Sequence, residues 1–305
     1  MPVRRRTSRV LIAVAAIVLL ASCSGSSGGD AAAPTTGTPT TATPTTATPT
    51  TQPTTTTPPA VWKATNAGEH ELPGDYRQGI AKVEGGWLIT TNNAVYRTND
   101  DFVKVPGSIG PAIPDDLAAQ GYNHIGDGDV HDGTLWVPLE RDDKSKAEQV
   151  TARYDAATLR FVDSFVVPQH HNAFVTVADD GSVYSMDEFS DKVLMHYVVK
   201  GTVVEQLEPI ALSRTVEKVQ GADLSADGAI WLSTNDDTNG IYRVDPATGS
   251  VQVVGTAGHI SAAGHGEGEG IDVTDLPTGL LHVIVADEKL VPMWAVDFKV
   301  TSAPA

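Results

Sequence analysis

"DGTLW", residues 132–136, decides the fold, because it recurs along the chain at nearly constant spacing. Two close copies are "DGSVY" at 180–184 and "DGAIW" at 227–231, and two looser copies are "GGWLI" at 85–89 and "TGLLH" at 278–282. The shared glycines are Gly86, Gly133, Gly181, Gly228 and Gly279, at spacings of 47, 48, 47 and 51. A repeat of this length is typical of radial and solenoid architectures.

Each repeat reads as a set of short strands. In the fourth repeat, "GADLS", "AIWLST", "GIYRVD" and "SVQVVG" are rich in β-branched or aromatic residues and are separated by Asp-Gly, Asn-Gly and Thr-Gly turns. Four strands per repeat make the blade of a β-propeller. We therefore predict an all-β propeller of five four-stranded blades, with a single helical turn at 114–120. A six-bladed ring, the alternative, needs a further repeat that the sequence does not contain.

The last repeat lacks its outer strand. After "GIDVT", "LLHVIVAD" and "PMWAVDFKV" the sequence ends, whereas "VWKAT" at 61–65 lies before the first repeat. A propeller must close its ring, so we expect this N-terminal strand to complete the fifth blade.

The N-terminal residues have the pattern of an export signal. Four arginines precede the unbroken apolar run Val10–Ala21, whose twelve residues are too few to span a bilayer. The run leads into Leu20-Ala21-Ser22-Cys23, which resembles a bacterial lipobox and implies cleavage before Cys23 and lipidation, such as palmitate, of its sulfur. An ordinary small-residue cleavage site is the alternative. Cys23 is the single cysteine of the chain, so no disulfide is expected.

Composition divides the rest of the chain. Residues 23–59 are a Thr/Pro-rich low-complexity stretch that we expect to be a disordered linker, because too few apolar side chains offset the ordering entropy. The predicted domains are the signal peptide 1–22, the linker 23–59 after a lipidated Cys23, the propeller 60–301 and the tail 302–305. The predicted location is the extracytoplasmic side of the cell membrane.

Charge limits the partners. Without the four arginines of the predicted signal peptide, 17 basic and 38 acidic residues remain, a net charge of −21. A field of this sign disfavours nucleic acid and anionic membrane surfaces. We expect a monomer that binds a small molecule or a protein at one propeller face and touches the membrane through its lipid.

Polar residues followed by small ones precede each repeat glycine. The pairs are Gln78-Gly79, Asp127-Gly128, Asn172-Ala173, Gln220-Gly221 and Glu269-Gly270. The first strand of each blade lines the channel, so these pairs are expected to ring one mouth, with small residues where the backbones converge. The ring either bonds channel water or supplies oxygen ligands to Ca²⁺. The predicted metal ligands are Asp127, Asn172 and Glu269, with Gln78 and Gln220 as further donors.

By contrast, Asp132-Gly133 is predicted to form a turn and to have no chemical role, with an exposed His131 beside it.

A second polar set lies beside this ring. Its members are His124, His170, His171, His265 and Glu267, with Arg77 and Lys218 at the corresponding edges of two other blades. Imidazoles and carboxylates together suit general acid–base catalysis or a transition metal. Unrelated polar loop residues are the alternative interpretation.

The "DG-x-hydrophobic-aromatic" and "YRVDPATG" patterns resemble those of the gluconolactonase and calcium-dependent phosphotriesterase-like propellers and of bacterial surface propeller repeats. The resemblance implies a six-bladed ring with a central divalent cation held by Glu, Asn and Asp, roles that Glu269, Asn172 and Asp127 would take. The five-bladed calcium-dependent apyrases are similar in ring size.

Three functions stay open from the sequence. The first is a lipid-anchored ligand- or protein-binding module, which we favour. The second is a metal-dependent hydrolase of a lactone or phosphoester, with Ca²⁺ as its cofactor and a rim histidine as base. The third is a propeller glycosidase, which needs two carboxylates across the channel, such as Asp127 with Glu269 or Glu267.

Overall fold

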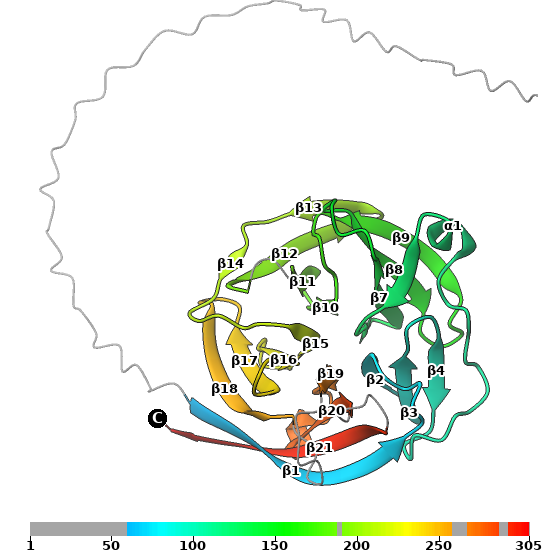
Figure 1. Cartoon of the computed structure of the whole chain (residues 1–305). Coiled ribbons are helices and arrows are strands. Elements are labelled where there is room, and N and C mark those ends of the chain that lie inside the picture. Colours follow the sequence, from blue (N-terminus) through cyan, green and yellow to red (C-terminus); the bar gives the residue numbers. More distant parts are fainter. Residues whose placement is uncertain (1–59, 188–190, 258–266, 287–291, 305) are drawn as a thin grey trace, which may run out of the picture. The chain divides into compact units, whose positions relative to one another are not determined.

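The computed structural model describes residues 60–187, 191–257, 267–286 and 292–304. Five small antiparallel sheets stand around a central axis, as the view along that axis shows (Figure 1). The predicted five-bladed β-propeller is confirmed. Each blade begins with a strand at the axis and continues outward.

The first two blades follow in chain order. Blade 1 contains β2 (Gly79–Val83), β3 (Gly86–Thr90) and β4 (Val95–Thr98). Its predicted fourth strand is only a pair of isolated bridges, Val95 to Ile109 and Thr98 to Lys104, because this segment contains prolines and glycines that interrupt a ladder. A helical turn, α1 (Asp115–Ala118), lies where the sequence predicts it. Blade 2 contains β5 (Tyr122–Ile125), β6 (Asp129–His131), β7 (Thr134–Arg141), β8 (Gln149–Asp155) and β9 (Phe161–Val167).

The other three blades complete the ring. Blade 3 contains β10 (Thr176–Val177), β11 (Ser182–Met186), β12 (Val193–Lys200), β13 (Val203–Gln206) and the short β14 (Ile210–Ala211). Blade 4 contains β15 (Val219–Leu224), β16 (Ile230–Thr234), β17 (Gly240–Asp245) and β18 (Ser250–Thr256). Blade 5 contains β19 (Glu267–Asp272), the 3₁₀ turn η1 (Leu276–Thr278), β20 (Leu280–Ala286), β21 (Met293–Pro304) and β1 (Ala60–Leu72).

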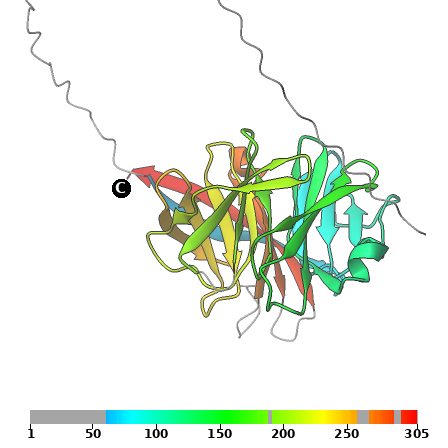
Figure 2. The same cartoon turned by 90° about the horizontal axis from the view of Figure 1, so that it is seen from above.

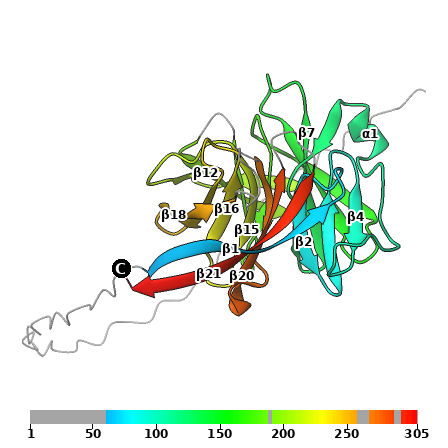
Figure 3. The same cartoon turned by 60° about the horizontal axis from the view of Figure 1, so that its bottom comes forward.

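The N-terminal strand closes the ring. β1 pairs with β21 from Ala60 opposite Pro304 to Leu72 opposite Met293, so it is the outer strand of blade 5 (Figure 3). The predicted strand at 61–65 is confirmed and is longer than predicted. Trp62 also packs edge-on against Trp231 of blade 4, with ring centroids 5.7 Å apart, and Arg243 stacks on the Trp62 ring. β1 therefore fastens blade 4 to blade 5.

The core lies between neighbouring blades. Every residue of β3, β11 and β16, the second strands of blades 1, 3 and 4, is buried. A second strand has a blade on either side, so both of its faces must be apolar or internally bonded. The repeated aromatic residue belongs to this layer, and Trp231 is fully buried.

The propeller has two faces, seen from the side in Figure 2. The turn face carries the turns between the first and second strands, and the loop face carries the loops that lead into the first strands. At the turn face, Asp132 and Gly133 have φ angles of 47° and 71°, which confirms the predicted turn. In the described part of the chain no helix is long and apolar enough to cross a membrane.

Candidate functional site

Asp127 sits where all five blades meet. Its carboxylate accepts the backbone N–H groups of Ile80 (3.1 Å), Ala222 (3.0 Å) and Ile271 (3.3 Å), which belong to blades 1, 4 and 5. Its own N–H donates to the carbonyl of Ala173 in blade 3 at 2.7 Å. Burial raises the pKa of Asp127 well above its usual range, although the three N–H groups oppose this shift. One side chain therefore joins the whole ring.

Glycines make room for Asp127. A Cβ on Gly79, Gly221 or Gly270 would lie 2.6–2.7 Å from an Asp127 carboxylate oxygen, closer than real contacts allow. The predicted convergence of small residues is confirmed for these three positions. In blade 2 the predicted pair Asp127-Gly128 is wrong, since the small residue that contacts the backbone of the next blade is Gly126, whose Cβ would overlap the Ala173 carbonyl. Asp127 thus lies inside the ring and not at its mouth.

Asn172 is bonded within the blades. It is fully buried, its Nδ2 donates to the Val150 carbonyl at 3.0 Å, and its Oδ1 accepts from Gln169 and from Ser185, each at 3.1 Å. Both ends of the carboxamide are therefore used by blades 2 and 3.

Glu269 is different, because its buried carboxyl forms no hydrogen bond with the described residues. Burial, with a smaller contribution from Glu267, raises its pKa to about 8, and Arg77 opposes the shift. Gln78 and Gln220 are half-buried at the equivalent positions of blades 1 and 4.

Two of the three predicted calcium ligands are already bonded within the protein. The polar atoms of Asp127 and Asn172 bond to separate partners, which a shared ion would have to displace. Among the described residues, no group of three or more His, Cys, Asp or Glu is arranged to hold a metal ion. The ligand set stays a prediction that this geometry does not favour, and we derive no chemistry from it.

A layer of aspartates that the sequence interpretation missed lies next to Asp127. Asp129 accepts the Val177 N–H at 2.8 Å, Asp223 accepts the Val273 N–H at 2.7 Å, and Asp272 accepts the Lys82 N–H at 2.7 Å. Each aspartate thus bonds to the next blade. The sequence does contain a signal for these aspartates. Each is a charged residue within the first strand of its blade and lies opposite an aromatic ring of the second strand, namely Trp136, Trp231 or His282.

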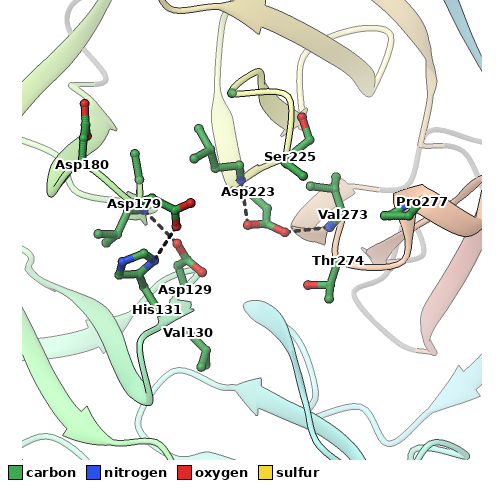
Figure 4. A pocket seen from close by; sticks show the side chains of 15 residues that line it. Asp129, Val130, His131, Asp179, Asp180, Asp223, Ser225, Val273, Thr274 and Pro277 are labelled. Atoms are coloured by element: carbon green, nitrogen blue, oxygen red, sulfur yellow. Dashed lines mark hydrogen bonds and ion pairs between the residues drawn. The ribbon is translucent and has the colours of Figure 1, made fainter.

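Two of these aspartates line a cavity that opens on the turn face. This turn-face cavity has a volume of about 530 Å³, and Asp129 and Asp223 extend toward its middle (Figure 4). Its other polar lining includes His131, Asp179, Ser225 and Thr274. His131 is half-buried, with its ring nitrogens 3.6 Å from Asp132 and 4.0 Å from Asp179, so the expectation that it is exposed is wrong.

Electrostatics set this cavity apart. Burial raises the pKa of Asp129 to about 6, and Asp272 adds to the shift. The pKa of Asp223 is raised well above its usual range by burial and by Asp272 and Asp129. Asp272 thus disfavours the ionisation of both Asp129 and Asp223, and Asp129 further disfavours that of Asp223.

The loop face gathers the predicted histidines of blades 2 and 3 around Glu140, which the sequence interpretation also missed. His171 Nε2 lies 3.4 Å from Glu140, and His124 is paired with Glu140 across β5 and β7. His170 Nδ1 lies 2.8 Å from the Lys144 carbonyl. Glu267 starts β19 in blade 5, whereas His265 lies outside the described residues. Of the predicted basic residues, Arg77 donates to the Gly74 carbonyl and Lys218 lies 4.0 Å from Asp237.

Solved structures with a similar fold include a candidate gluconolactonase, with a TM-score of 0.50 and 15% identity over 76% of this chain and 78% of that one. The calcium-binding protein regucalcin of Agrobacterium tumefaciens str. C58 has a TM-score of 0.46 and 14% identity over 72% and 76%. A PQQ-bound aldose sugar dehydrogenase of Streptomyces coelicolor has a TM-score of 0.48 and 8% identity over 80% of this chain and 100% of that one. No family model matches the chain, and no curated protein matches its sequence. The resemblance to gluconolactonase propellers is confirmed at the level of fold, and the ring has five blades instead of the six that the resemblance implies.

Proposed function

We propose that the chain is a lipid-anchored, extracytoplasmic binding protein whose propeller takes a small organic cation in the turn-face cavity. The observation that carries the proposal is the pair Asp129 and Asp223, two carboxyl groups that line one cavity, where burial raises the pKa of both and Asp129 hinders the ionisation of Asp223.

A cation would relieve this repulsion. Asp129 uses its Oδ2 to accept from Val177 and from Thr176, while its Oδ1 has no hydrogen-bond partner among the described residues. A positively charged group near Oδ1 would be attracted to the ionised carboxylates. This attraction is stronger in a partly desolvated cavity than in water. The acidic balance of the chain, −17 overall, draws cations toward the protein.

The size of the cavity favours an organic ligand over a bare ion. Its volume of about 530 Å³ lies in the range of small-molecule sites, which is roughly 300–1,000 Å³. His131, Ser225 and Thr274 add neutral hydrogen-bonding groups, so an amine with hydroxyl or amide groups fits this lining.

The anchor is part of the proposal and rests on the sequence. The lipobox-like Leu20-Ala21-Ser22-Cys23 and the short apolar run before it support attachment through Cys23. We expect Cys23→Ala to move the protein from the membrane fraction to the soluble fraction. A mutant that stays with the membrane would contradict the anchor and leave the binding proposal untouched.

Calorimetric titration of the purified protein with putrescine, spermidine, choline and Ca²⁺ tests the ligand class. Asp129→Asn is the sharpest variant, because the amide oxygen can keep the Val177 and Thr176 bonds while the cavity-facing charge disappears. We expect at least one of the amines to bind, and Asp129→Asn to weaken that binding about tenfold, the effect of one charge-assisted bond worth about 1.4 kcal/mol.

Asp132→Asn is the matched control, since the Asp132 side chain is 94% exposed. It should bind as the wild type does. Equal weakening by the two variants, or no binding of any amine, would overturn the proposed ligand class.

A further inference from the structure

A second cavity opens on the loop face of blade 2, away from the turn-face cavity. This loop-face cavity has a volume of about 380 Å³. Its lining includes Asn123, His124, Glu140, Arg141, Asp142 and Lys144. Three of these residues carry basic groups, which the turn-face cavity lacks apart from His131.

The acidic groups of the loop-face cavity are already bonded. Glu140 is buried, and its carboxylate takes Lys144 Nζ at 2.6 Å, the Asn172 N–H and His171 at 3.4 Å. Asp142 accepts from Asn123 Nδ2 at 3.0 Å. Neither carboxylate therefore needs a cationic ligand.

The basic groups, in contrast, retain bonding capacity. Lys144 has three N–H donors, of which Glu140 takes one. Arg141 has five N–H donors, and its Nη2 bonds to Glu148 at 3.3 Å. The His124 ring forms no hydrogen bond with the described residues. The groups still to be satisfied are donors, so the complementary ligand is an acceptor.

We propose that the loop-face cavity binds a small carboxylate anion, which Lys144, Arg141 and His124 hold. A planar monocarboxylate offers two acceptor oxygens to these donors. A dianion such as phosphate is a poorer match, because Glu140 and Asp142 lie in the same cavity. The site is independent of the turn-face cavity and of the cation proposed there.

Binding should take up a proton. Burial lowers the pKa of His124, and the charges of Lys144 and His171 lower it further. The carboxylates of Glu140 and Asp142 raise it, but by less, so the pKa stays below its usual value. The free imidazole is therefore neutral at pH 7, and a bound carboxylate raises its pKa by adding a negative charge beside it. Affinity must then rise as the pH falls toward 6.

The test is a titration of the purified protein with acetate and with benzoate at pH 6.0 and 7.5, followed by the His124 imidazole signals in NMR. We expect the carboxylate to bind at least threefold more tightly at pH 6.0 and to raise the His124 pKa. Phosphate should bind more weakly than either carboxylate. His124→Gln should remove the pH dependence, and Lys144→Met should weaken binding about tenfold at both pH values.

His196→Gln is the matched control, because the His196 ring bonds to Ser182 on blade 3, outside both cavities. It should leave binding and its pH dependence unchanged. The proposal is overturned if neither carboxylate binds or if phosphate binds more tightly than both. It is also overturned if a carboxylate binds but leaves the His124 signals and the His124 pKa unchanged, because the binding is then elsewhere.

Discussion

Replacing Glu269 by Gln should stabilise the protein, and the gain should depend on pH. Glu269 as a whole residue is only 7% exposed, and the pKa of its carboxyl rises from an ordinary 4.5 to about 8 in the fold, chiefly through burial. Between these two values the folded state holds a proton that the unfolded state has released. Stability therefore falls as the pH rises from about 4.5 to 8.

The size of the effect follows from the shift. At pH 7 the ordinary carboxyl lies 2.5 units above its pKa of 4.5, and each unit is worth about 1.4 kcal/mol, so keeping Glu269 neutral costs about 3 kcal/mol. Above pH 8 the cost approaches about 5 kcal/mol. Glutamine keeps the shape and cannot ionise, so it avoids this cost while its amide meets the same surroundings as the neutral acid.

Urea unfolding at pH 4.5, 7.0 and 8.5 measures the difference between the two proteins. We expect nearly equal free energies of unfolding at pH 4.5 and a more stable Glu269→Gln variant at pH 7.0 and 8.5. Asp132→Asn is the control and should change little at any pH, since its side chain is exposed and its positive φ accepts Asn. A gain that is the same at all three pH values would refute the reasoning. If Ca²⁺ raised the melting temperature of the wild type but not of Glu269→Gln, Glu269 would be an ion ligand as the sequence suggested.

Three further predictions concern how the ring is held. Asp127→Ala leaves three buried N–H groups without their acceptor and should lower the free energy of unfolding in urea by at least about 3 kcal/mol. Asp127→Asn should lower it less. Equal stability of the wild type and the alanine variant would contradict the role of Asp127 in joining the blades. The two ring nitrogens of His282 bond to Asp297 (2.8 Å) and Asp275 (3.1 Å), which requires the charged imidazolium. Burial lowers the pKa of His282, but the carboxylates around the ring outweigh it and raise this pKa above its usual value. The contribution of His282 to stability is complete below pH 6.5 and is lost as the pH rises through the pKa of the folded state. Melting temperatures should therefore fall more between pH 6 and 9 in the wild type than in His282→Gln. Parallel curves of melting temperature against pH would disprove this. Deleting residues 60–72 removes β1 and should lower the melting temperature severely, while deleting residues 24–58 should leave it unchanged; equal melting temperatures would exclude closure of the ring by β1.

Much of the fold was predictable because it depends on short-range chemistry that repeats. The Asp-Gly turns, the buried aromatic residue three positions after each closer repeat glycine and the missing outer strand of the last repeat together indicate five blades and their closure. Blade 1 departs from the pattern because the segment between β4 and α1 contains three prolines and cannot form a regular fourth strand.

The candidate sites were less predictable, because they depend on register. A one-residue irregularity between β5 and β6 moves Asp127 from the expected mouth into the centre of the ring, and the sequence does not reveal it. Glu140 was missed since it is the penultimate residue of a mostly apolar strand, and only the fold places it beside His171. Asp129 and Asp223 lie in the first strands of two different blades, and only the folded ring brings them to one cavity.

The most direct test of the central claim is the number of protons released when an amine binds in the turn-face cavity at pH 6. Calorimetry in two buffers with different ionisation enthalpies measures this number. Asp129, with a pKa of about 6, is half-protonated there and must ionise to hold a cation, so the wild type should release a measurable fraction of a proton per amine bound. Asp129→Asn should release less. Binding without proton release, or the same release from both proteins, would contradict a carboxylate cavity that receives a cation.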